Sequence, residues 1–394
     1  LNHENNISTI KIIERNKTVN LGTLQLDKPS QEIKEVVITR SSPIKLKKDT
    51  IEYNSQNFKN GTEQNVEDLL KKLPGITVEK DGKIKLGDKT VESVMIEGED
   101  IFERGYQTLT QSMPSDPLDK VEVLTNYSKN KLLKNIENSG GVGINLTLKE
   151  NAKSRWMGNA ILASTSYVEN MQQVKLNLMN FSKKRKTYLL FNYNNLGIDE
   201  MKGVEYLIRP SISNSVESVG QNVDLRNVVN LHMRNSVYGD NRTNFNNDKL
   251  GSLNYIYDFK NDWKIKLVTI FNQTQNRNYL DSYYNFNDGN TQFTNIENKS
   301  WKQSLQNIVG KVELSKSYKK ASLLFYNKFS KMDENNDNRF LFNGIENFQN
   351  GKTEQWTNEN SLVYTQKIDS LSAFVAAARY IYIKRPQLVN DQNN

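Results

Sequence analysis

Few residues in this sequence have the types and spacing that catalysis or metal binding requires. The only histidines are His3 and His232, which lie far apart and lack a nearby cluster of partners, so zinc chemistry and a Ser-His-Asp triad have little to build on. The chain has no cysteine, which excludes disulfides and thiolate metal sites. The sequence therefore predicts no catalytic residue, no metal site and no cofactor, and we do not expect an enzyme.

Two further patterns could carry a function, and for both the plainer interpretation is favoured. The carboxylate pairs Glu99-Asp100 and Asp333-Glu334 could accept calcium, but we expect them to be solvated surface loops. The run Gly140-Gly141-Val142-Gly143 is rich in glycine, as phosphate-binding loops are. No helix and no Lys-Ser or Lys-Thr pair follows it, so a phosphate loop is not predicted.

Composition excludes one class of membrane protein and leaves another open. Hydrophobic residues make up 36% of the chain, the mean hydropathy is -0.71, and no stretch approaches the roughly 20 apolar residues of a membrane helix. A helical membrane protein is excluded, whereas a β-barrel is not, because its strands show only every second residue to lipid. The net charge of +8 is spread along the chain, so nucleic acid is not an expected partner.

The elements that would position any site change in character along the chain. Residues 8–13 and 18–26 favour two short strands, which we assign to the end of a small β-sandwich at 1–33. The isolated β-branched run Glu35, Val36, Val37, Ile38 and Thr39 follows, within a polar segment at 34–48 that is typical of a linker.

A compact α/β pattern occupies 49–150. Thr62 is the predicted N-cap of a helix whose apolar stripe is Val66, Leu69, Leu70 and Leu73, and Pro74-Gly75 ends that helix. Asp81-Gly82 predicts a hairpin between 76–79 and 83–86, because both turn residues tolerate positive φ. Further strands are expected at 93–97, 121–125 and 142–148.

From 151 onward, apolar and polar residues alternate with the period of β-strands. Val174, Leu176 and Leu178 alternate with Lys175 and Asn177, and the same pattern recurs around 252–259 and 263–267. Short links are expected near 167–170, 182–186, 259–262, 316–320 and 367–371, and long ones at 195–250 and 333–352. Two extended strands, 263–286 and 291–316, meet at Asn287-Asp288-Gly289-Asn290. Short turns alternating with long links are typical of a membrane barrel.

The expected barrel is incomplete in this sequence. We count about nine strands by residue 383, whereas plugged transporters have about 22. The chain begins at Leu1 without a signal peptide and ends on the polar residues 391–394, so we expect a piece of a longer protein. The fold class is thus mainly β: remnant sandwich strands, a small α/β domain, and the first part of an antiparallel transmembrane β-barrel at 151–394.

These segments resemble the TonB-dependent outer-membrane receptors common in Bacteroidetes. The stretch 19–26 is similar to the end of the carboxypeptidase-regulatory-like domain that precedes many of them, and 35–39 is similar to their TonB box. The plug resemblance is the most specific. It rests on residues 49–54 (DTIEYN), 66–76 (VEDLLKKLPGI), 81–84 (DGKI), 94–98 (VMIEG) and 140–149 (GGVGINLTLK).

The resemblance implies a function, a location and partners. Such receptors import a ligand through a plugged barrel in the outer membrane of Gram-negative bacteria, and the TonB box pairs as an added strand with the periplasmic domain of TonB. Glu35, Val36, Val37, Ile38 and Thr39 would make that contact here. Outer-membrane lipids and a surface lipoprotein are further possible partners. The ligand stays open among siderophore, glycan and peptide.

Two other functions remain open at this point. One is an outer-membrane barrel that serves adhesion or surface-protein anchoring and never transports. The other is a soluble β-rich binding protein, which would extract without detergent. Loss of uptake on deleting 35–39 would separate transport from anchoring.

Overall fold

The computed structural model describes residues 42–393 except 103–104, 135, 137–139, 166–169 and 199–242, together with a few single residues before 42. The chain divides into two units, Leu1–Ser42 and Pro43–Asn394. The expected sandwich strands at 8–13 and 18–26 and the TonB-box-like segment at 35–39 lie outside the described residues, apart from single positions. Within the described part of the chain, no helix has both the length and the apolar character to span a membrane.

The α/β domain is built on a seven-stranded sheet whose strand order is β1-β2-β6-β7-β5-β4-β3. Its elements are β1 (Ile44–Lys47), β2 (Thr50–Asn54), η1 (Ser55–Phe58), α1 (Val66–Leu70), β3 (Ile76–Val78), β4 (Ile84–Leu86), β5 (Lys89–Ile96), α2 (Tyr106–Ser112), β6 (Leu118–Tyr127) and β7 (Gly141–Leu148). The expected stripe Val66, Leu69, Leu70 and Leu73 is buried in its core. The hairpin at Asp81-Gly82 is also confirmed, with β3 paired to β4.

The predicted N-cap of α1 is wrong. Asn65, not Thr62, caps the helix: its side chain accepts from the Asp68 N–H at 2.9 Å, and the Asp68 carboxylate accepts from the Asn65 N–H, which forms a capping box. The Thr62 hydroxyl instead donates to Asn60 Oδ1. A capping box satisfies two orphan N–H groups at once, which explains why the later residue prevails.

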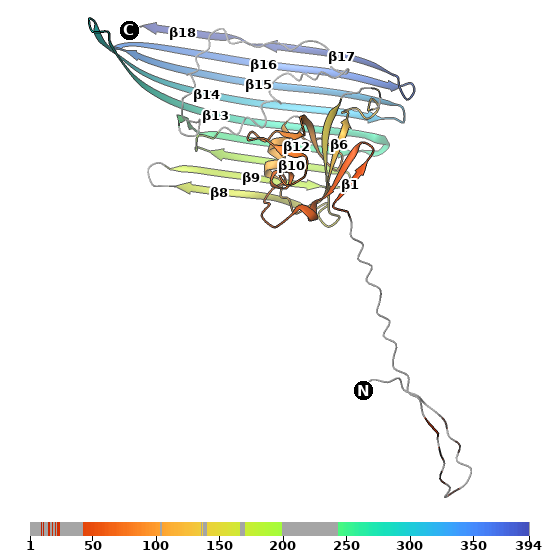
Figure 1. The fold of residues 1–394 in the computed structure, drawn as a ribbon. Helices are drawn as coiled ribbons and strands as arrows, with labels where there is room; N and C mark the ends of the chain where they lie inside the picture. The colour runs from red at the N-terminus through yellow and green to blue at the C-terminus, as the bar shows by residue number, and fades with distance from the viewer. Residues whose placement is uncertain are drawn as a thin grey trace. The chain divides into compact units, whose positions relative to one another are not determined.

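The second sheet is antiparallel and much larger (Figure 1). Its main path runs β17-β16-β15-β14-β13-β12-β10-β9-β8, with β11 paired to β13 and β18 to β16. The strands are β8 (Trp156–Thr165), β9 (Met171–Phe181), β10 (Arg185–Asn194), β11 (Phe245–Asn246), β12 (Asp248–Asp258), β13 (Trp263–Asn287), β14 (Gln292–Ser317), β15 (Ala321–Phe342), β16 (Ile345–Lys367), β17 (Ala373–Lys384) and β18 (Gln387–Asn393). The single-turn helix η4 (Lys260–Asp262) links β12 to β13.

Four of the five predicted short links and one long link are confirmed, the short link at 167–170 lies outside the described residues except for residue 170, and the other long link is wrong. Residues 182–184, 259–262, 318–320 and 368–372 are short turns, and β10 and β12 are separated by 195–247. The expected long link at 333–352 is instead strand, because β15 and β16 meet at the two-residue turn Asn343-Gly344. Both turn residues have positive φ, 47° and 87°, which suits the twist of a hairpin. The polar run 335–338 is held in the ladder by β14 on one side and β16 on the other.

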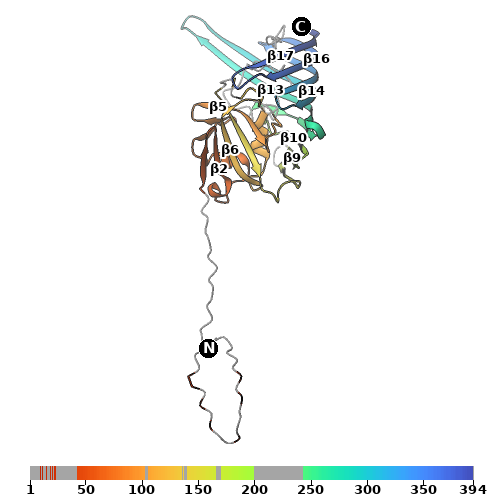
Figure 2. The ribbon, with the colours of Figure 1, turned by 90° about the vertical axis from the view of Figure 1, so that its right-hand side faces the viewer.

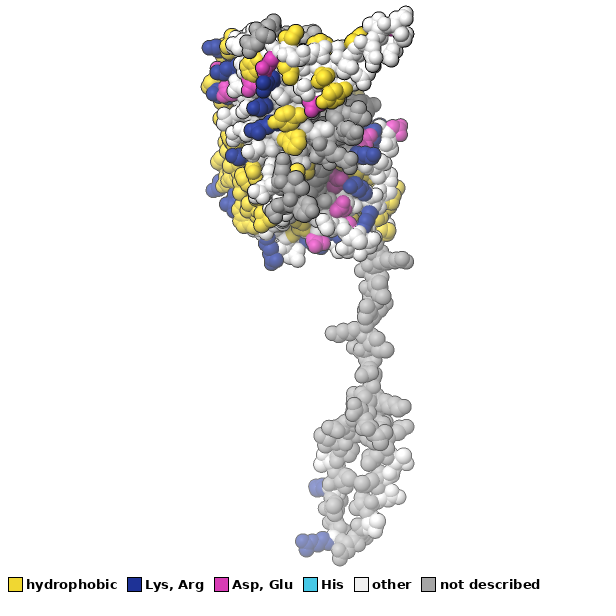
Figure 3. Space-filling model, turned by 90° about the vertical axis from the view of Figure 1, so that its left-hand side faces the viewer, with side chains coloured by type: hydrophobic (Ala, Val, Ile, Leu, Met, Phe, Trp, Pro, Cys, Tyr) yellow, Lys and Arg dark blue, Asp and Glu magenta, His cyan; other side chains and the backbone are white. Residues whose placement is uncertain are grey.

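The large sheet has two chemically different faces, because successive side chains of a strand point to opposite faces. On the outer face, exposed apolar side chains form a band across neighbouring strands, and Figure 3 shows hydrophobic side chains gathered along one margin of the molecule. The band includes Leu176, Leu189, Phe191, Phe271, Ile308, Val312, Phe325, Phe329, Trp356, Leu362, Phe374, Tyr380 and Tyr382.

The band is one membrane thickness tall, although the strands are longer. On β13 the outer positions from Trp263 to Phe271 are apolar or Thr, and the next is Gln273. A tilted strand needs about 9 to 11 residues to cross a bilayer. β13 has 25 residues and β14 has 26, so this pair extends far beyond the band, and Figure 2 shows it (cyan) projecting from the sheet.

The structure confirms the expected fold class: mainly β, with a small α/β domain followed by an antiparallel sheet with the two-faced pattern of a barrel wall. The inner face combines apolar side chains that join the buried core, such as Leu190, Val268 and Ile270, with polar and charged ones. The polar and charged ones include Asn177, Asn192, Asn254, Lys266, Asn307, Lys311, Lys328 and Glu359, all buried.

Candidate functional site

The α/β domain packs against the inner face of the large sheet, and this contact is the candidate functional site. Both ribbon views place the domain on one side of the sheet, near the end of the strands that carries the short turns (Figures 1 and 2). The contacts come from the chain between β5 and α2 and from the segment after β6. They reach β10, β13 and β16 of the large sheet.

A tight turn after β5 presents the first group of contacts. Glu97 and Gly98 have φ of 50° and 77°, so Gly98 occupies a backbone conformation that favours glycine. Ile96 and Glu99 exchange two backbone hydrogen bonds of 3.0 Å across this turn. The Glu97 carboxylate accepts from the Leu148 N–H at 2.7 Å, and the Gly98 N–H donates to Asn145 Oδ1 at 2.8 Å. These bonds to β7 fix the direction in which the following residues point.

Glu99 and Asp100 then meet two lysines of β13. Lys264 forms an ion pair with the Glu99 carboxylate and lies 3.5 Å from Asp258. Lys266 Nζ donates to the Asp100 backbone carbonyl at 2.8 Å, and Ser93 Oγ donates to the Asp100 carboxylate at 2.7 Å. Lys264 and Lys266 are successive inner-face positions of one strand. We call Glu99, Asp100, Lys264 and Lys266 the latch.

An aromatic contact lies beside the latch. Phe102 is 1% exposed, and its ring meets the Tyr188 ring of β10 edge to face, with 4.6 Å between centroids. The Tyr188 hydroxyl donates to Asn177 Oδ1 at 3.0 Å on β9. Aromatic pairs of this geometry are worth roughly 0.5–1.5 kcal/mol beyond the area they bury. Farther along the sheet, Asn130 Nδ2 donates to Thr365 Oγ1 of β16 at 2.9 Å, so the domain contacts widely separated strands.

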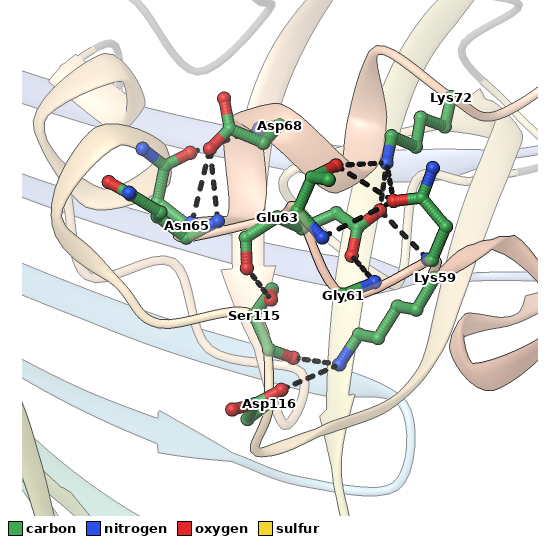
Figure 4. Close-up of polar contacts among 11 residues, drawn as sticks. Lys59, Gly61, Glu63, Asn65, Asp68, Lys72, Ser115 and Asp116 are labelled. Atoms are coloured by element: carbon green, nitrogen blue, oxygen red, sulfur yellow. Dashed lines mark hydrogen bonds and ion pairs between the residues drawn. The ribbon is translucent and has the colours of Figure 1, made fainter.

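A second polar cluster, inside the α/β domain, holds α1 to the turn before β6 (Figure 4). The Glu63 carboxylate accepts from Lys72 and from the N–H groups of Asn60 and Gly61, both at 3.1 Å. The hydrogen bond from Lys72 is the main reason that the pKa of Glu63 falls to about 2. Ser115 Oγ donates to the Glu63 backbone carbonyl at 3.0 Å.

Lys59 completes this cluster. Its Nζ donates to the Ser115 carbonyl at 2.5 Å and lies 3.9 Å from Asp116 (Figure 4). Burial lowers the pKa of Lys59, because desolvation disfavours the charged form. No member of the cluster faces the large sheet in a described contact, so its role is to stiffen the α/β domain.

The first strands of the domain carry further ion pairs. Glu52 of β2 is 6% exposed and accepts from Lys47 of β1 at 2.6 Å and pairs with Lys120 of β6 at 3.1 Å. These hydrogen bonds lower the pKa of Glu52. Tyr53 donates from its hydroxyl to the Pro74 carbonyl at 2.7 Å, and burial raises its pKa. β2 is thereby tied to both neighbouring strands and to the end of α1.

Sequence reasoning placed some of these residues wrongly. Glu99-Asp100 is not a solvated pair, because it forms half of the latch. Asp333-Glu334 is not a loop: both residues are in β15, where Asp333 pairs with Lys331 at 2.8 Å and Glu334, 7% exposed, accepts from Gln303 on the inner face. The latch lysines alternate with Ile265 and Leu267 in sequence, which was the one available signal. His3, His232 and 35–39 lie outside the described residues.

The structure brings together no constellation of another kind. Among the described residues, no group of three or more His, Cys, Asp or Glu side chains could hold a metal ion. Gly140-Gly141-Val142-Gly143 leads into β7, where the pairing with β5 and β6 is irregular at Val142 and Gly143. A Cβ at Gly143 would lie 2.6 Å from the Tyr127 ring, so this glycine makes room for an aromatic side chain.

Comparisons with known proteins gave structural matches alone. No family model matches the sequence, and no curated protein matches it. The ferric yersiniabactin uptake receptor FyuA from Yersinia pestis matches with TM-score 0.29 and 9% identity, over 87% of this chain and 60% of that one. The siderophore receptor PiuA from Acinetobacter baumannii matches with TM-score 0.32 and 12% identity, over 88% and 46%.

A third match is the ferric-catecholate import receptor Fiu from E. coli K12, with TM-score 0.28 and 10% identity, over 89% of this chain and 66% of that one. The chain therefore spans about half to two thirds of the length of these receptors. All three TM-scores are below 0.5, so these matches do not establish the function of this chain.

Proposed function

We propose that this chain is the N-terminal part of a TonB-dependent outer-membrane receptor that imports a ligand through a plugged β-barrel and is not an enzyme. In this proposal 1–33 is the end of a carboxypeptidase-regulatory-like domain, 34–48 is the TonB-box segment with its linker, 49–150 is the plug and 151–394 is the first part of the barrel. The location is the outer membrane of a Gram-negative bacterium.

One observation supports this function above the others: the large sheet exposes an apolar band on the face that nothing described covers, while the face that the α/β domain covers carries buried polar and charged side chains among its apolar ones. A soluble sheet packs its apolar face against the rest of the protein and leaves the polar face to water. An apolar face that stays exposed suits a wall with lipid outside and a plug inside. The height of the apolar band agrees with that of a bilayer.

The latch supports the assignment of the α/β domain as a plug that is held to the barrel wall by reversible, non-covalent contacts. The contacts of the latch are an ion pair and hydrogen bonds, which can break and re-form, and the aromatic pair of Phe102 and Tyr188 lies beside it. We propose that Glu35, Val36, Val37, Ile38 and Thr39 bind the periplasmic domain of TonB by strand addition, and that force on this segment displaces the plug from the latch.

The test is uptake by cells that express the full-length gene with or without residues 35–39. Ferric chelates, oligosaccharides and peptides would be offered as labelled probes, and surface levels would be matched. Loss of uptake of one probe on deletion supports energised import. A matched deletion of 29–33 shortens the chain equally and keeps both 35–39 and β1, so a loss that follows length alone counts against a TonB contact.

A second function has one observation in its favour. The tip of the β13–β14 hairpin exposes Tyr279, Tyr283, Tyr284, Phe286 and Phe293. An exposed apolar surface of this kind suits a protein contact, as in an anchoring barrel. Unchanged uptake of every probe after deletion of 35–39, with loss of a surface partner after truncation of the hairpin tip, would favour anchoring over import.

A further inference from the structure

The inner face of the large sheet changes in chemistry along the strands. Near the latch it carries lysines and an arginine, whereas the two rows of cross-strand partners that pass through Asn192 and Asn194 carry no lysine or arginine between β10 and β16. Side-chain amides recur in these two rows and in the next row, which passes through Asn246. We call the following residues the amide patch: Asn192, Asn194, Asn246, Gln303, Asn307 and Asn336.

The amide patch spans several strands on one face. Asn192 of β10 is opposite Leu250, Leu250 is opposite Asn272, and Asn272 is opposite Asn307 of β14. Three strand spacings separate Asn192 from Asn307, which is about 14 Å. This width suits a molecule of several rings or residues better than a single ion.

Part of the hydrogen-bonding capacity of the patch is unused. Both amide atoms of Asn192, Nδ2 of Asn194 and Oδ1 of Asn307 and Asn336 have no hydrogen-bond partner. These four side chains are only 2%, 1%, 2% and 8% exposed. An unpaired buried polar group costs about 1–3 kcal/mol, so a cluster of them needs an explanation beyond folding.

The charged groups nearer the latch are, by contrast, paired. Lys264 pairs with Glu99, Lys266 donates to the Asp100 carbonyl, and Lys186 lies 3.9 Å from Asp258. Arg379 donates to Glu359 at 2.8 Å, while the second carboxylate oxygen of Glu359 has no partner. In these pairs every cation has a partner, and the unpaired atom is a carboxylate oxygen.

We propose that the amide patch binds a neutral ligand rich in hydroxyl or amide groups, such as an oligosaccharide or a peptide backbone. Each amide both donates and accepts, which matches hydroxyl and peptide groups, whereas an anionic metal chelate is bound best by cations, and the patch contains none. The side chains of the patch are buried in this structure, so binding requires that the residues packed over them first move away. This inference names the ligand class of the proposed import function and rests on it.

The experiment measures binding to the purified full-length protein in detergent by calorimetry. The probes are a dextran-derived oligosaccharide mixture, an acetylated and amidated Ala-Ser pentapeptide, and ferric citrate. We expect saturable binding of a neutral probe and none of ferric citrate, and the two neutral arms distinguish sugar from peptide. The variant Asn192→Leu with Asn307→Leu should weaken binding at least about 10-fold, because it removes hydrogen-bonding groups from the site.

A matched pair, Asn327→Leu with Asn360→Leu, makes the same chemical change on the outer face, where the two amides bond to each other at 2.9 Å. It should leave binding unchanged. If the inner pair fails to fold, Asn192→Ser with Asn307→Ser keeps polarity and should still weaken binding. Binding of ferric citrate alone, or of no neutral probe, overturns the inference.

The outcomes also separate this inference from the proposed function. If the protein binds a neutral probe but uptake is unchanged by deletion of 35–39, the ligand class of the amide patch is supported and energised import is rejected. If uptake requires 35–39 and only ferric citrate is taken up, the import function is supported and the ligand class of the amide patch is rejected.

Discussion

At the scale of single residues, Gly143 is a position where close packing requires glycine. A Cβ there would lie 2.6 Å from Cδ2 of the Tyr127 ring, while Gly251 has no neighbouring atom within 4 Å of its would-be Cβ. We expect Gly143→Ala to destabilise the α/β domain by about 1–3 kcal/mol through overpacking, and Gly251→Ala to have little effect.

The measurement is the urea concentration at which protease cuts the α/β domain in the full-length protein. Because Gly143 and Tyr127 are in contact, Gly143→Ala combined with Tyr127→Leu should cost less than the sum of the two single changes. Strict additivity would show that the tyrosine ring is not the obstacle.

Glu63 should make the α/β domain sensitive to acid. Its pKa falls to about 2 in the folded protein, mainly through the hydrogen bond from Lys72, against an ordinary value of 4.5. A depressed pKa stabilises the folded state at pH above the ordinary value, and this contribution is lost as pH falls from about 4.5 toward 2.

We therefore expect Glu63→Gln to destabilise the domain at neutral pH and to flatten its pH dependence below about 4.5. Protease resistance of the full-length protein, measured from pH 7 to pH 2.5, reports this difference. Asp116→Asn serves as the control, because its carboxylate is 97% exposed and 3.9 Å from Lys59. An equal flattening in both variants would contradict the assignment to Glu63.

At the scale of elements, the latch should set how firmly the α/β domain is held to β13. Lys264→Glu would place a third carboxylate beside Glu99 and Asp258, so we expect the domain to loosen. Glu99→Lys combined with Lys264→Glu restores one opposite pair and should recover part of the loss. Vancomycin sensitivity of cells expressing the full-length protein measures a leaky plug. Equal sensitivity of the single and double variants would mean that the pair does not hold the domain.

Regular elements were largely predictable from sequence, since hydrophobic period and turn residues are local. The β3–β4 hairpin at Asp81-Gly82, the buried stripe of α1 and the alternating strands follow from such patterns. The Asn343-Gly344 turn was missed because the polar residues 335–338 were interpreted as loop, although ladder pairing on both sides makes them strand. Local composition contains no information about such neighbours.

The candidate site was far less predictable. Glu99 and Lys264 are 165 residues apart, and Phe102 meets a tyrosine on another sheet. Charge alone indicates solvent at Glu99-Asp100, and only the tertiary contact gives these residues a partner. The amide patch was hidden for the same reason: single asparagines and glutamines favour loops, and they form a surface only because four strands bring them to one face.

At the scale of the whole molecule, the cost of a charge on the outer face of the large sheet should depend on whether the charge lies within the apolar band. Leu253 lies on the outer face within the apolar band, and Gln306 lies on the same face just beyond it. Leu253→Arg should cost about 2–4 kcal/mol on folding into a bilayer, and Gln306→Arg close to nothing. The measurement is the urea dependence of folding of the full-length protein into lipid vesicles. Equal costs at the two positions would argue against a lipid-facing band.

The position of β1 has a mechanical consequence. β1 is a four-residue strand at the edge of its sheet, bonded to β2 alone, and its first pair is Ile44 with Tyr53. A load applied through the chain before Pro43 would break the pairs in turn from Ile44 to Lys47, rather than all together. Once residues 44–49 have left the sheet, the extended chain that precedes β2 is longer by about 20 Å. The load then reaches β2, which the contacts of Glu52 and Tyr53 hold in the sheet. The domain therefore yields to force in two steps: β1 detaches at low force, and β2 requires a higher one.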